Sequence, residues 1–102
     1  MQQLHQSSVD RLFETIAGLK SMEECYLFFE DLCTAKEILG MAQRLETARL
    51  LDRGMAYAAI SGQTGISSAT ISRVSRCLQF GSGGYRLALD RGREAADAEQ
   101  TP

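Results

Sequence analysis

Apolar side chains recur every three or four residues in successive segments of this chain, the spacing that places them on one face of an α-helix. The first such segment begins at Val9 and continues to Leu19. This period predicts a first helix, which Gly18 and Lys20 help to end. No stretch shows the strict alternation of a β-strand, and the pattern therefore predicts an all-α protein.

Two capping boxes mark where the second and third helices begin. In Ser21-Met-Glu-Glu24 the serine oxygen can accept a hydrogen bond from the backbone near Glu24, while the glutamate reaches back. The box Thr34-Ala-Lys-Glu37 repeats this arrangement further along. The second helix is accordingly expected to end at about Cys33, and the third to begin directly after it.

The third helix is expected from about Ala35 to Arg53, with Gly54 as its C-terminal stop. Its apolar residues form a stripe that is nearly too wide for one neighbouring helix. A helix of this kind suits contact from two sides, which indicates association with a second copy of the chain. The stripe consists of Ile38, Leu39, Met41, Ala42, Leu45, Ala48, Leu50 and Leu51.

Residues 56–78 predict a helix-turn-helix. Ile60 is an inward apolar residue of its first helix, and the small Ser61 lets a second helix cross closely. Gly65 stands where the chain must turn sharply, because glycine accepts a left-handed backbone without strain. Ile66 fills the corner, and Ser67 is a good N-cap for the next helix. The inward residues of that helix are Ile71, Val74 and Leu78. An ordinary helical hairpin would show similar spacing.

The outward face of this second helix favours DNA binding over a hairpin exposed only to solvent. Its side chains are short or cationic, whereas a solvated face usually mixes glutamate and lysine. Small polar groups that approach base edges or phosphates, followed by arginines that bind phosphates or a guanine edge, suit a helix in the major groove. The expected contacts are Ser68, Ala69, Thr70, Ser72, Arg73 and Arg76 here, Tyr57 and Gln63 on the first helix of the motif, and Arg53 at the end of the third helix.

A glycine-rich loop at residues 81–84 precedes a sixth helix, expected from about Gly84 to Arg93. The loop lacks the preceding strand and the lysine of a phosphate-binding loop, and it is predicted to be a turn. The predicted domain spans residues 9–93, between a flexible N-terminal tail (1–8) and an acidic, disordered tail (94–102).

Composition bounds the size and class of the protein. A chain of 102 residues makes one small domain that buries only part of its apolar surface alone, so a core shared with a second copy is expected. Hydrophobic content of 44% with one proline and no tryptophan fits a helical globule. The chain shows neither an apolar run of about 18 residues nor a signal peptide, and no membrane association and a cytoplasmic location are expected.

The distribution of charge matters more than the net charge of −2. Residues 1–39 carry a net charge of −4, residues 40–93 one of +5 from eight arginines and three acids, and residues 94–102 one of −3. The cationic part coincides with the helix-turn-helix and its neighbours, as attraction to DNA phosphates requires.

Nothing in the sequence supports catalysis, a metal site or a cofactor. The cysteines 25, 33 and 77 lack metal-ligand spacing, and His5 is the single histidine. Cys25 and Cys33 fall two turns apart on an apolar helix face and are expected to be buried, reduced thiols, with a redox role as the alternative. The paired carboxylates point around their helices rather than into one pocket. The protein is therefore not expected to be an enzyme.

Four sequence segments together resemble the Trp repressor superfamily, in the branch of the YerC/YecD-type proteins, over roughly residues 12–92. They are Leu32-Cys-Thr-Ala-Lys-Glu-Ile-Leu, Ala42-Gln-Arg-Leu-Glu46, Gly65-Ile-Ser-Ser-Ala-Thr-Ile-Ser-Arg-Val-Ser-Arg-Cys-Leu78 and Gly84-Tyr85. The resemblance implies a six-helix fold, all-α, whose N-terminal helices interlock with those of a second subunit.

The resemblance also raises the question of an effector. In Trp repressor two arginines enclose the indole ring of tryptophan, and Arg44 and Arg73 match those positions. Val74 replaces a glycine and would fill space that the indole needs, while Cys77 replaces a serine and is a weak hydrogen-bond partner. Tryptophan is therefore not the expected ligand. As alternatives, Arg44 pairs with an acid on its own helix or on the other subunit, and Arg73 contacts a phosphate.

These observations predict a homodimeric transcriptional regulator, a repressor, that binds double-stranded DNA at a palindromic operator with half-sites about one turn (~34 Å) apart. An amino-acid-related small molecule is a candidate effector, and constitutive binding is equally open. The alternative function is a dimeric helical interaction module that has no preferred DNA sequence.

Overall fold

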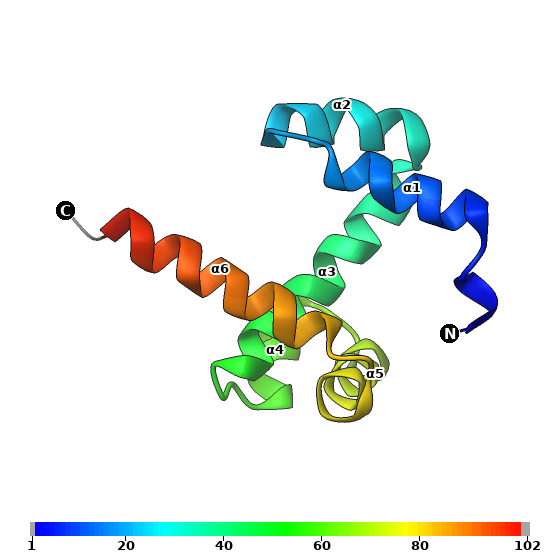
Figure 1. Ribbon diagram of the computed structural model, residues 1–102. Helices are drawn as coiled ribbons and strands as arrows, with labels where there is room; N and C mark the ends of the chain where they lie inside the picture. The colour runs from blue at the N-terminus through cyan, green and yellow to red at the C-terminus, as the bar shows by residue number, and fades with distance from the viewer. Residues whose placement is uncertain (1, 101–102) are drawn as a thin grey trace. The chain divides into compact units, whose positions relative to one another are not determined.

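The computed structural model describes residues 2–100 of the chain, and the side chains of residues 3–99 (Figure 1). This part contains helices and no strand, which confirms the predicted all-α class with six α-helices. The elements are a short 3-10 helix η1 (Gln2–Leu4), α1 (Ser7–Ala17), α2 (Met22–Leu32), α3 (Ala35–Asp52), α4 (Tyr57–Thr64), α5 (Ser68–Phe80) and α6 (Gly84–Gln100).

The two predicted capping boxes are present, and they differ in one detail. Thr34 Oγ1 accepts from the Glu37 N–H at 3.1 Å, and the Glu37 carboxylate accepts from the Thr34 N–H at 2.8 Å. Ser21 likewise accepts from the Glu24 N–H at 3.1 Å, but the Glu24 carboxylate accepts from the N–H of Lys20, one residue before the cap. These local bonds explain why α2 and α3 begin where the sequence predicted.

Two predicted helix ends need correction. Helix α1 begins at Ser7, two residues before Val9, and the short helix η1 precedes it. Helix α6 continues to Gln100 instead of ending near Arg93, so it extends into the acidic segment that follows the predicted domain. Alanine and glutamate in this stretch are strong helix formers, which outweighs its net negative charge. Met1 and residues 101–102 lie outside the described part.

The chain divides into two compact units, residues 1–38 and residues 39–102. The first contains η1, α1, α2 and the first turn of α3. No residue of α1 or α2 is buried. The most exposed large apolar side chains of this unit are Phe13 (58%), Met22 (75%), Tyr26 (62%) and Leu27 (63%). The apolar faces that periodicity predicted therefore exist, and their large side chains are mostly exposed.

The predicted burial of two thiols is corrected for the same reason. Cys25 is exposed and Cys33 is half-buried, and both are free thiols, as is the exposed Cys77. Cys25 lies beside Met22 and Tyr26 along a shallow apolar hollow of α2. Helical spacing placed Cys25 correctly on the apolar face, but it could not show whether anything covers that face.

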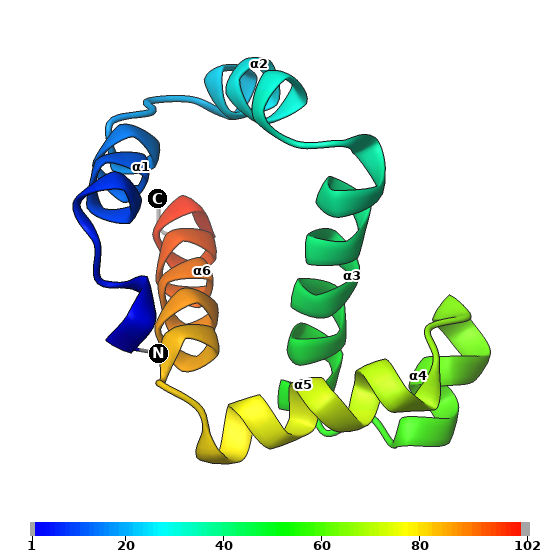
Figure 2. The same cartoon turned by 90° about the vertical axis from the view of Figure 1, so that its right-hand side faces the viewer.

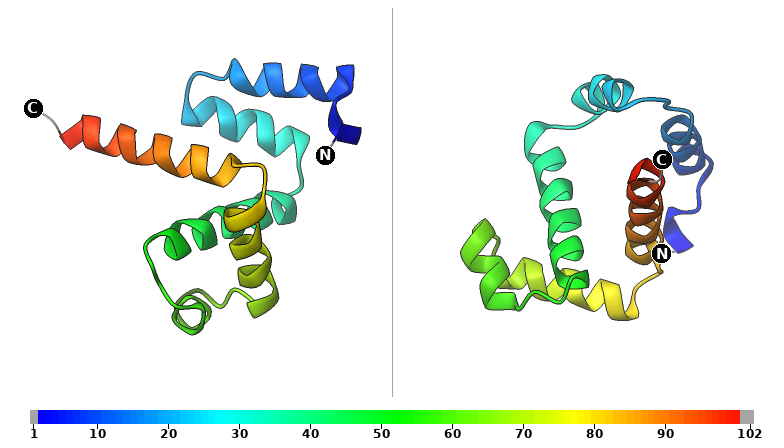
Figure 3. Two further views of the ribbon diagram at one scale, coloured as in Figure 1. Left: turned by 60° about the horizontal axis from the view of Figure 1, so that its bottom comes forward. Right: turned by 90° about the vertical axis from the view of Figure 1, so that its left-hand side faces the viewer.

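The second unit holds the buried core. In one cluster, Leu50 of α3 packs with Ile60 of α4 and Ile71 of α5. In the other, Ala48 of α3 packs with Val74 of α5 and Leu89 of α6. Figure 2 and the right-hand view of Figure 3 both show α5 crossing the C-terminal end of α3, where these clusters lie. The outer surface of α5 is thus set by packing against three other helices.

Candidate nucleic-acid interface

The turn between α4 and α5 is held by backbone geometry and local hydrogen bonds. Gly65 has a φ of 74°, in the left-handed region that favours glycine, and its N–H donates to the Ser61 oxygen at 2.9 Å. The Thr64 hydroxyl donates to the Ile60 oxygen at 2.6 Å and accepts from the Ile66 N–H at 3.1 Å. Ile66 belongs to the first core cluster. The predicted helix-turn-helix geometry is therefore confirmed.

The start of α5 is capped by Ser67, as predicted. The Ser67 hydroxyl oxygen accepts from the Thr70 N–H at 3.2 Å, and the same hydroxyl donates to the Thr70 side chain at 3.0 Å. Thr70 is half-buried. Thr70 therefore has a structural role at the cap, and it is less available for contact with DNA than its neighbours Ser68 and Ala69.

The two faces of α5 separate as the pattern predicted. Ile71 is fully buried and Val74 is 1% exposed. The opposite face is exposed and carries Ser68, Ala69, Ser72, Arg73, Arg76 and Cys77. The guanidinium groups of Arg73 and Arg76 make no ion pair or hydrogen bond with any residue between 2 and 100. Two unneutralised cations on an exposed helix face are what phosphate binding needs.

The other residues predicted to contact DNA differ in exposure and in hydrogen bonding. Gln63 and Arg53 are exposed. Tyr57 is 45% exposed, but its hydroxyl donates to Ser75 Oγ of α5 at 2.5 Å. The sequence predicted only a contact with the DNA backbone for Tyr57; the structure shows that its hydroxyl also joins α4 to α5.

The residues matched to the effector site of Trp repressor differ in their surroundings. Val74 points into the core against Ala48 and Leu89. Arg44 is half-buried, and its guanidinium lies close to Gly40 on its own helix, where an added Cβ would stand 3.6 Å from Nη1. No acid within residues 2–100 pairs with Arg44, so the ion pair expected on its own helix is absent there.

Sequence reasoning missed an ion-pair network that joins α3 to α6. The Asp52 carboxylate, whose side chain is 14% exposed, pairs with Arg86 at 2.8 Å and also with Arg93. Arg86 further pairs with Asp90 at 3.2 Å. The sequence contains only a weak indication of this network. Two arginines seven residues apart lie on one side of a helix, but no nearby residue identifies the acidic side chain with which they pair.

A second pair, Glu46 with Arg49 at 2.6 Å, lies within α3. The hydrogen bond from Arg49 holds the pKa of Glu46 below its ordinary value, and the same bond raises the pKa of Arg49.

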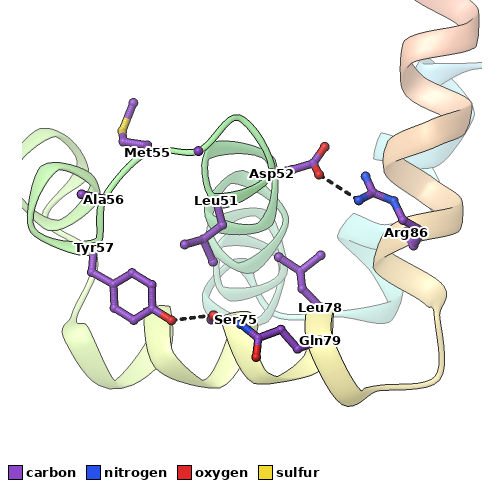
Figure 4. A pocket seen from close by; sticks show the side chains of 10 residues that line it. Leu51, Asp52, Met55, Ala56, Tyr57, Ser75, Leu78, Gln79 and Arg86 are labelled. Carbon is purple, nitrogen blue, oxygen red and sulfur yellow. Dashed lines mark hydrogen bonds and ion pairs between the residues drawn. The ribbon is translucent and has the colours of Figure 1, made fainter.

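A hollow of about 450 Å³ lies on the second unit, between the end of α3 and the three helices that follow it (Figure 4). Leu51, Asp52, Tyr57, Ser75, Leu78 and Arg86 are among the residues that line it. No group of three or more metal-ligating side chains occurs in the described part of the chain. None of its helices is long and apolar enough to cross a bilayer.

The fold and this helix-turn-helix define an all-helical protein of the Trp repressor type. The family model described as "Trp repressor protein" matches residues 7–93, and the chain belongs to this family. The Bacillus subtilis (strain 168) protein YerC, itself uncharacterized, is 54% identical over 91 residues, which cover 89% of this chain and 88% of YerC. The predicted YerC-type branch is therefore confirmed.

Two crystal structures share the fold at substantial identity. A TrpR-like protein from Eubacterium eligens ATCC 27750 superposes with a TM-score of 0.85 at 44% identity, covering 89% of this chain and 94% of that one. A Staphylococcus aureus protein of the same Trp repressor type superposes with a TM-score of 0.86 at 46% identity, covering 90% and 92%.

Proposed function

We propose that this protein is a sequence-specific, DNA-binding transcriptional regulator, a repressor, which acts as a homodimer on a palindromic operator. The observation that carries the proposal is the exposed face of α5, where Arg73 and Arg76 are unpaired within the described residues and follow short polar side chains. In this proposal α5 enters the major groove. Ser68, Ala69 and Ser72 approach bases or phosphates, and the two arginines supply the phosphate attraction.

The dimer in this proposal is supported by what the first unit leaves uncovered. Large apolar side chains on α1 and α2 are more than half exposed, among them Phe13, Tyr26 and Leu27. Contiguous exposed apolar surface on a small protein usually marks an interface. On α3, where the sequence predicts a wide apolar face, Leu39 (63%) and Leu45 (48%) are also exposed. In the proposed dimer the two α5 helices lie about one DNA turn (~34 Å) apart, as a palindromic site requires.

A small-molecule effector forms the finer part of the proposal, with constitutive DNA binding as the alternative. Tryptophan held between Arg44 and Arg73 has little support, because Val74 is occupied in core packing and Cys77 offers only a thiol. An effector would act only by binding the DNA-competent form of the dimer more tightly than the other form.

The test begins with selection of binding sites from random double-stranded DNA, followed by salt titration of affinity for the selected site. We expect a palindrome to be recovered. Binding becomes weaker as salt rises, so the slope of the logarithm of the association constant against the logarithm of the salt concentration is negative. Arg76→Ala should make this slope less steep by about 0.9 for each phosphate that the variant no longer binds. The matched control is Arg91→Ala, which removes an exposed arginine of α6 and should leave the slope unchanged.

Two results would contradict the proposal. Recovery of no preferred sequence, even at low salt, would favour the interaction module, in which a protein partner covers the arginine-bearing face of α5. A salt slope that Arg76→Ala and Arg91→Ala reduce equally would show that the attraction is diffuse rather than centred on α5.

A further inference from the structure

The hollow beside the helix-turn-helix has the size of a small-ligand site. Its volume of about 450 Å³ lies within the range of roughly 300–1,000 Å³ that small-molecule sites occupy. Its walls come from α3, from the connection to α4, and from α4, α5 and α6. Neither Arg44 nor Arg73 lines it. It is therefore a different place from the position that the resemblance to Trp repressor suggests for an effector.

One wall of this hollow presents a hydroxyl proton that has no acceptor. Tyr57 donates to Ser75 Oγ at 2.5 Å, and this bond uses the tyrosine proton while the serine keeps its own. Two other helix hydroxyls use their protons by donating to a backbone oxygen four residues back, the buried Thr47 at 2.8 Å and Thr64 at 2.6 Å. Ser75, only 7% exposed, makes no such bond to any described residue.

The opposite wall presents an uncommitted guanidinium nitrogen. Arg86 uses Nη1 to bind Asp52 at 2.8 Å and Nε to bind Asp90 at 3.2 Å, which leaves Nη2 without a partner among residues 2–100. Asp52 also lines the hollow, but its carboxylate is shared with Arg93 as well. The charges of these two acids and two arginines balance, so the network has no net charge, and Nη2 can attract an anion only through the hydrogen bonds that it donates.

The surface between these two walls is apolar. Figure 4 shows Leu51 and Leu78 between the Tyr57–Ser75 pair and the Asp52–Arg86 pair. We propose that the hollow binds a small organic acid: a carboxylate accepts from Arg86 Nη2, a short aliphatic body lies on Leu51 and Leu78, and a second oxygen accepts the Ser75 proton. The free hydroxyl and guanidinium groups are both donors, which favours a ligand rich in acceptors.

Occupancy of this site would bear on DNA binding, a part of the inference that rests on the proposed function. The ligand touches α3 on one side and both helices of the helix-turn-helix on the other, across the connection that contains Gly54 (φ 87°). A ligand that contacts these elements together stabilises the orientation of α4 and α5 to which it binds most tightly. It therefore shifts the population of the DNA-competent form.

The test is titration of the full-length, ¹⁵N-labelled protein with glutarate, followed in amide and side-chain NMR signals. Glutarate has two carboxylates joined by three methylene groups, and the matched control 1,5-diaminopentane has a similar length with opposite charge. We expect glutarate to shift the signals of Leu51, Gln79 and Arg86, and the diamine to shift none of them. Ser75→Ala should weaken glutarate binding about fivefold, the loss of one hydrogen bond, while binding of butyrate, which lacks the second carboxylate, should not change.

Several results would overturn the assignment. Absence of glutarate shifts would do so, as would shifts spread equally over Arg73, Arg76 and Arg91, because these indicate general attraction to exposed cations. If Ser75→Ala weakened the binding of glutarate and of butyrate equally, the proposed hydrogen bond between Ser75 and the second carboxylate would be refuted. The spectrum of the variant itself reports whether its fold is intact.

A separate measurement decides the regulatory part. At saturating glutarate, a change of threefold or more in affinity for the selected DNA would support coupling, and an unchanged affinity would overturn it. Failure of the protein to bind any DNA would refute the proposed function alone, because the NMR titration tests the ligand site without DNA.

Discussion

Asp52, the last residue of α3, accepts a 2.8 Å hydrogen bond from Arg86 of α6, 34 positions further along the chain. Arg93, two turns beyond Arg86, pairs with the same carboxylate. Two guanidinium groups on one helix that share one largely buried acid limit how α6 can slide or rotate along α3. This contact adds to the packing of Leu89 of α6 against Ala48 of α3 and Val74 of α5.

Replacement of this acid should destabilise the protein measurably. We expect Asp52→Asn to lower the free energy of unfolding by about 1–2 kcal/mol, because both arginines lose a charged acceptor in a partly desolvated place. The control Asp90→Asn removes a pair whose side chains are 50% and 47% exposed, and it should cost less than about 0.5 kcal/mol. Urea unfolding followed by circular dichroism measures both. Equal effects would mean that the Asp52 network contributes no more than a surface ion pair.

The stability of the helix-turn-helix should require glycine at position 65 but not at position 62. Gly65 has a φ of 74°, and Gly65→Ala should destabilise the fold by about 1–2 kcal/mol through backbone strain alone, since no atom lies within 4 Å of the added Cβ. Gly62 lies inside α4 with equally open space around it. Gly62→Ala should therefore stabilise by up to about 1 kcal/mol through helix propensity. Thermal unfolding of the two variants would refute this account if both shifted in the same direction.

The Thr34–Glu37 capping box should contribute a small stabilisation that is lost at low pH. The N–H of Thr34 lowers the pKa of Glu37, because it donates to the ionised carboxylate. A folded-state pKa below the unfolded value means that this stabilisation is present above about pH 4.3, and is lost as the pH falls through the lowered pKa. Glu37→Gln keeps an acceptor but cannot ionise, and should remove that part of the pH dependence.

Circular dichroism melts between about pH 3 and 6 compare these profiles. Glu37→Ala, which removes the acceptor altogether, should be less stable than the parent protein at neutral pH. A parent profile that Glu37→Gln leaves unchanged would show that the box makes no acid-dependent contribution.

The uncovered face of α1 should control association. Phe13 is 58% exposed, and in an isolated chain Phe13→Glu would be a harmless surface change. In the proposed dimer it places a carboxylate in an apolar interface, which should shift the protein from dimer to monomer. The matched control is Arg11→Glu, which adds a carboxylate to the opposite side of the same helix. Sedimentation equilibrium gives the mass of each. A parent protein that is already monomeric would remove the dimer from the proposal.

Most of the helical framework was predictable because the signals involved are local. Capping boxes join residues three apart, and the left-handed turn at Gly65 depends on one residue type. The burial of Ile71 and Val74 follows from a period of less than four residues. The exposure of Arg73 and Arg76 on the outward face of α5 followed from the same period.

Two features lay beyond the local pattern, since they depend on residues far apart or on a second surface, and one helix end was predicted too early. The bond from Tyr57 to Ser75 spans 18 positions, and no local pattern distinguishes a tyrosine that contacts DNA from one that joins two helices. The exposure of Cys25 depends on what covers α2, which its own period cannot show. The extension of α6 to Gln100 is a local effect, in which helix propensity outweighs the net charge of the segment.

The amino-acid sequence by itself determined where the helices begin, where they turn and which of their faces are apolar, because each of these depends on hydrogen bonds and sterics within one or two helical turns. Only the tertiary structure decided that Asp52 binds both Arg86 and Arg93, that the Tyr57 hydroxyl bonds Ser75, and that a hollow remains between the end of α3 and the helix-turn-helix. Those outcomes depend on which helices pack against each other. The same local pattern permits many helix pairings, and only the packing of segments far apart in the sequence selects one of them.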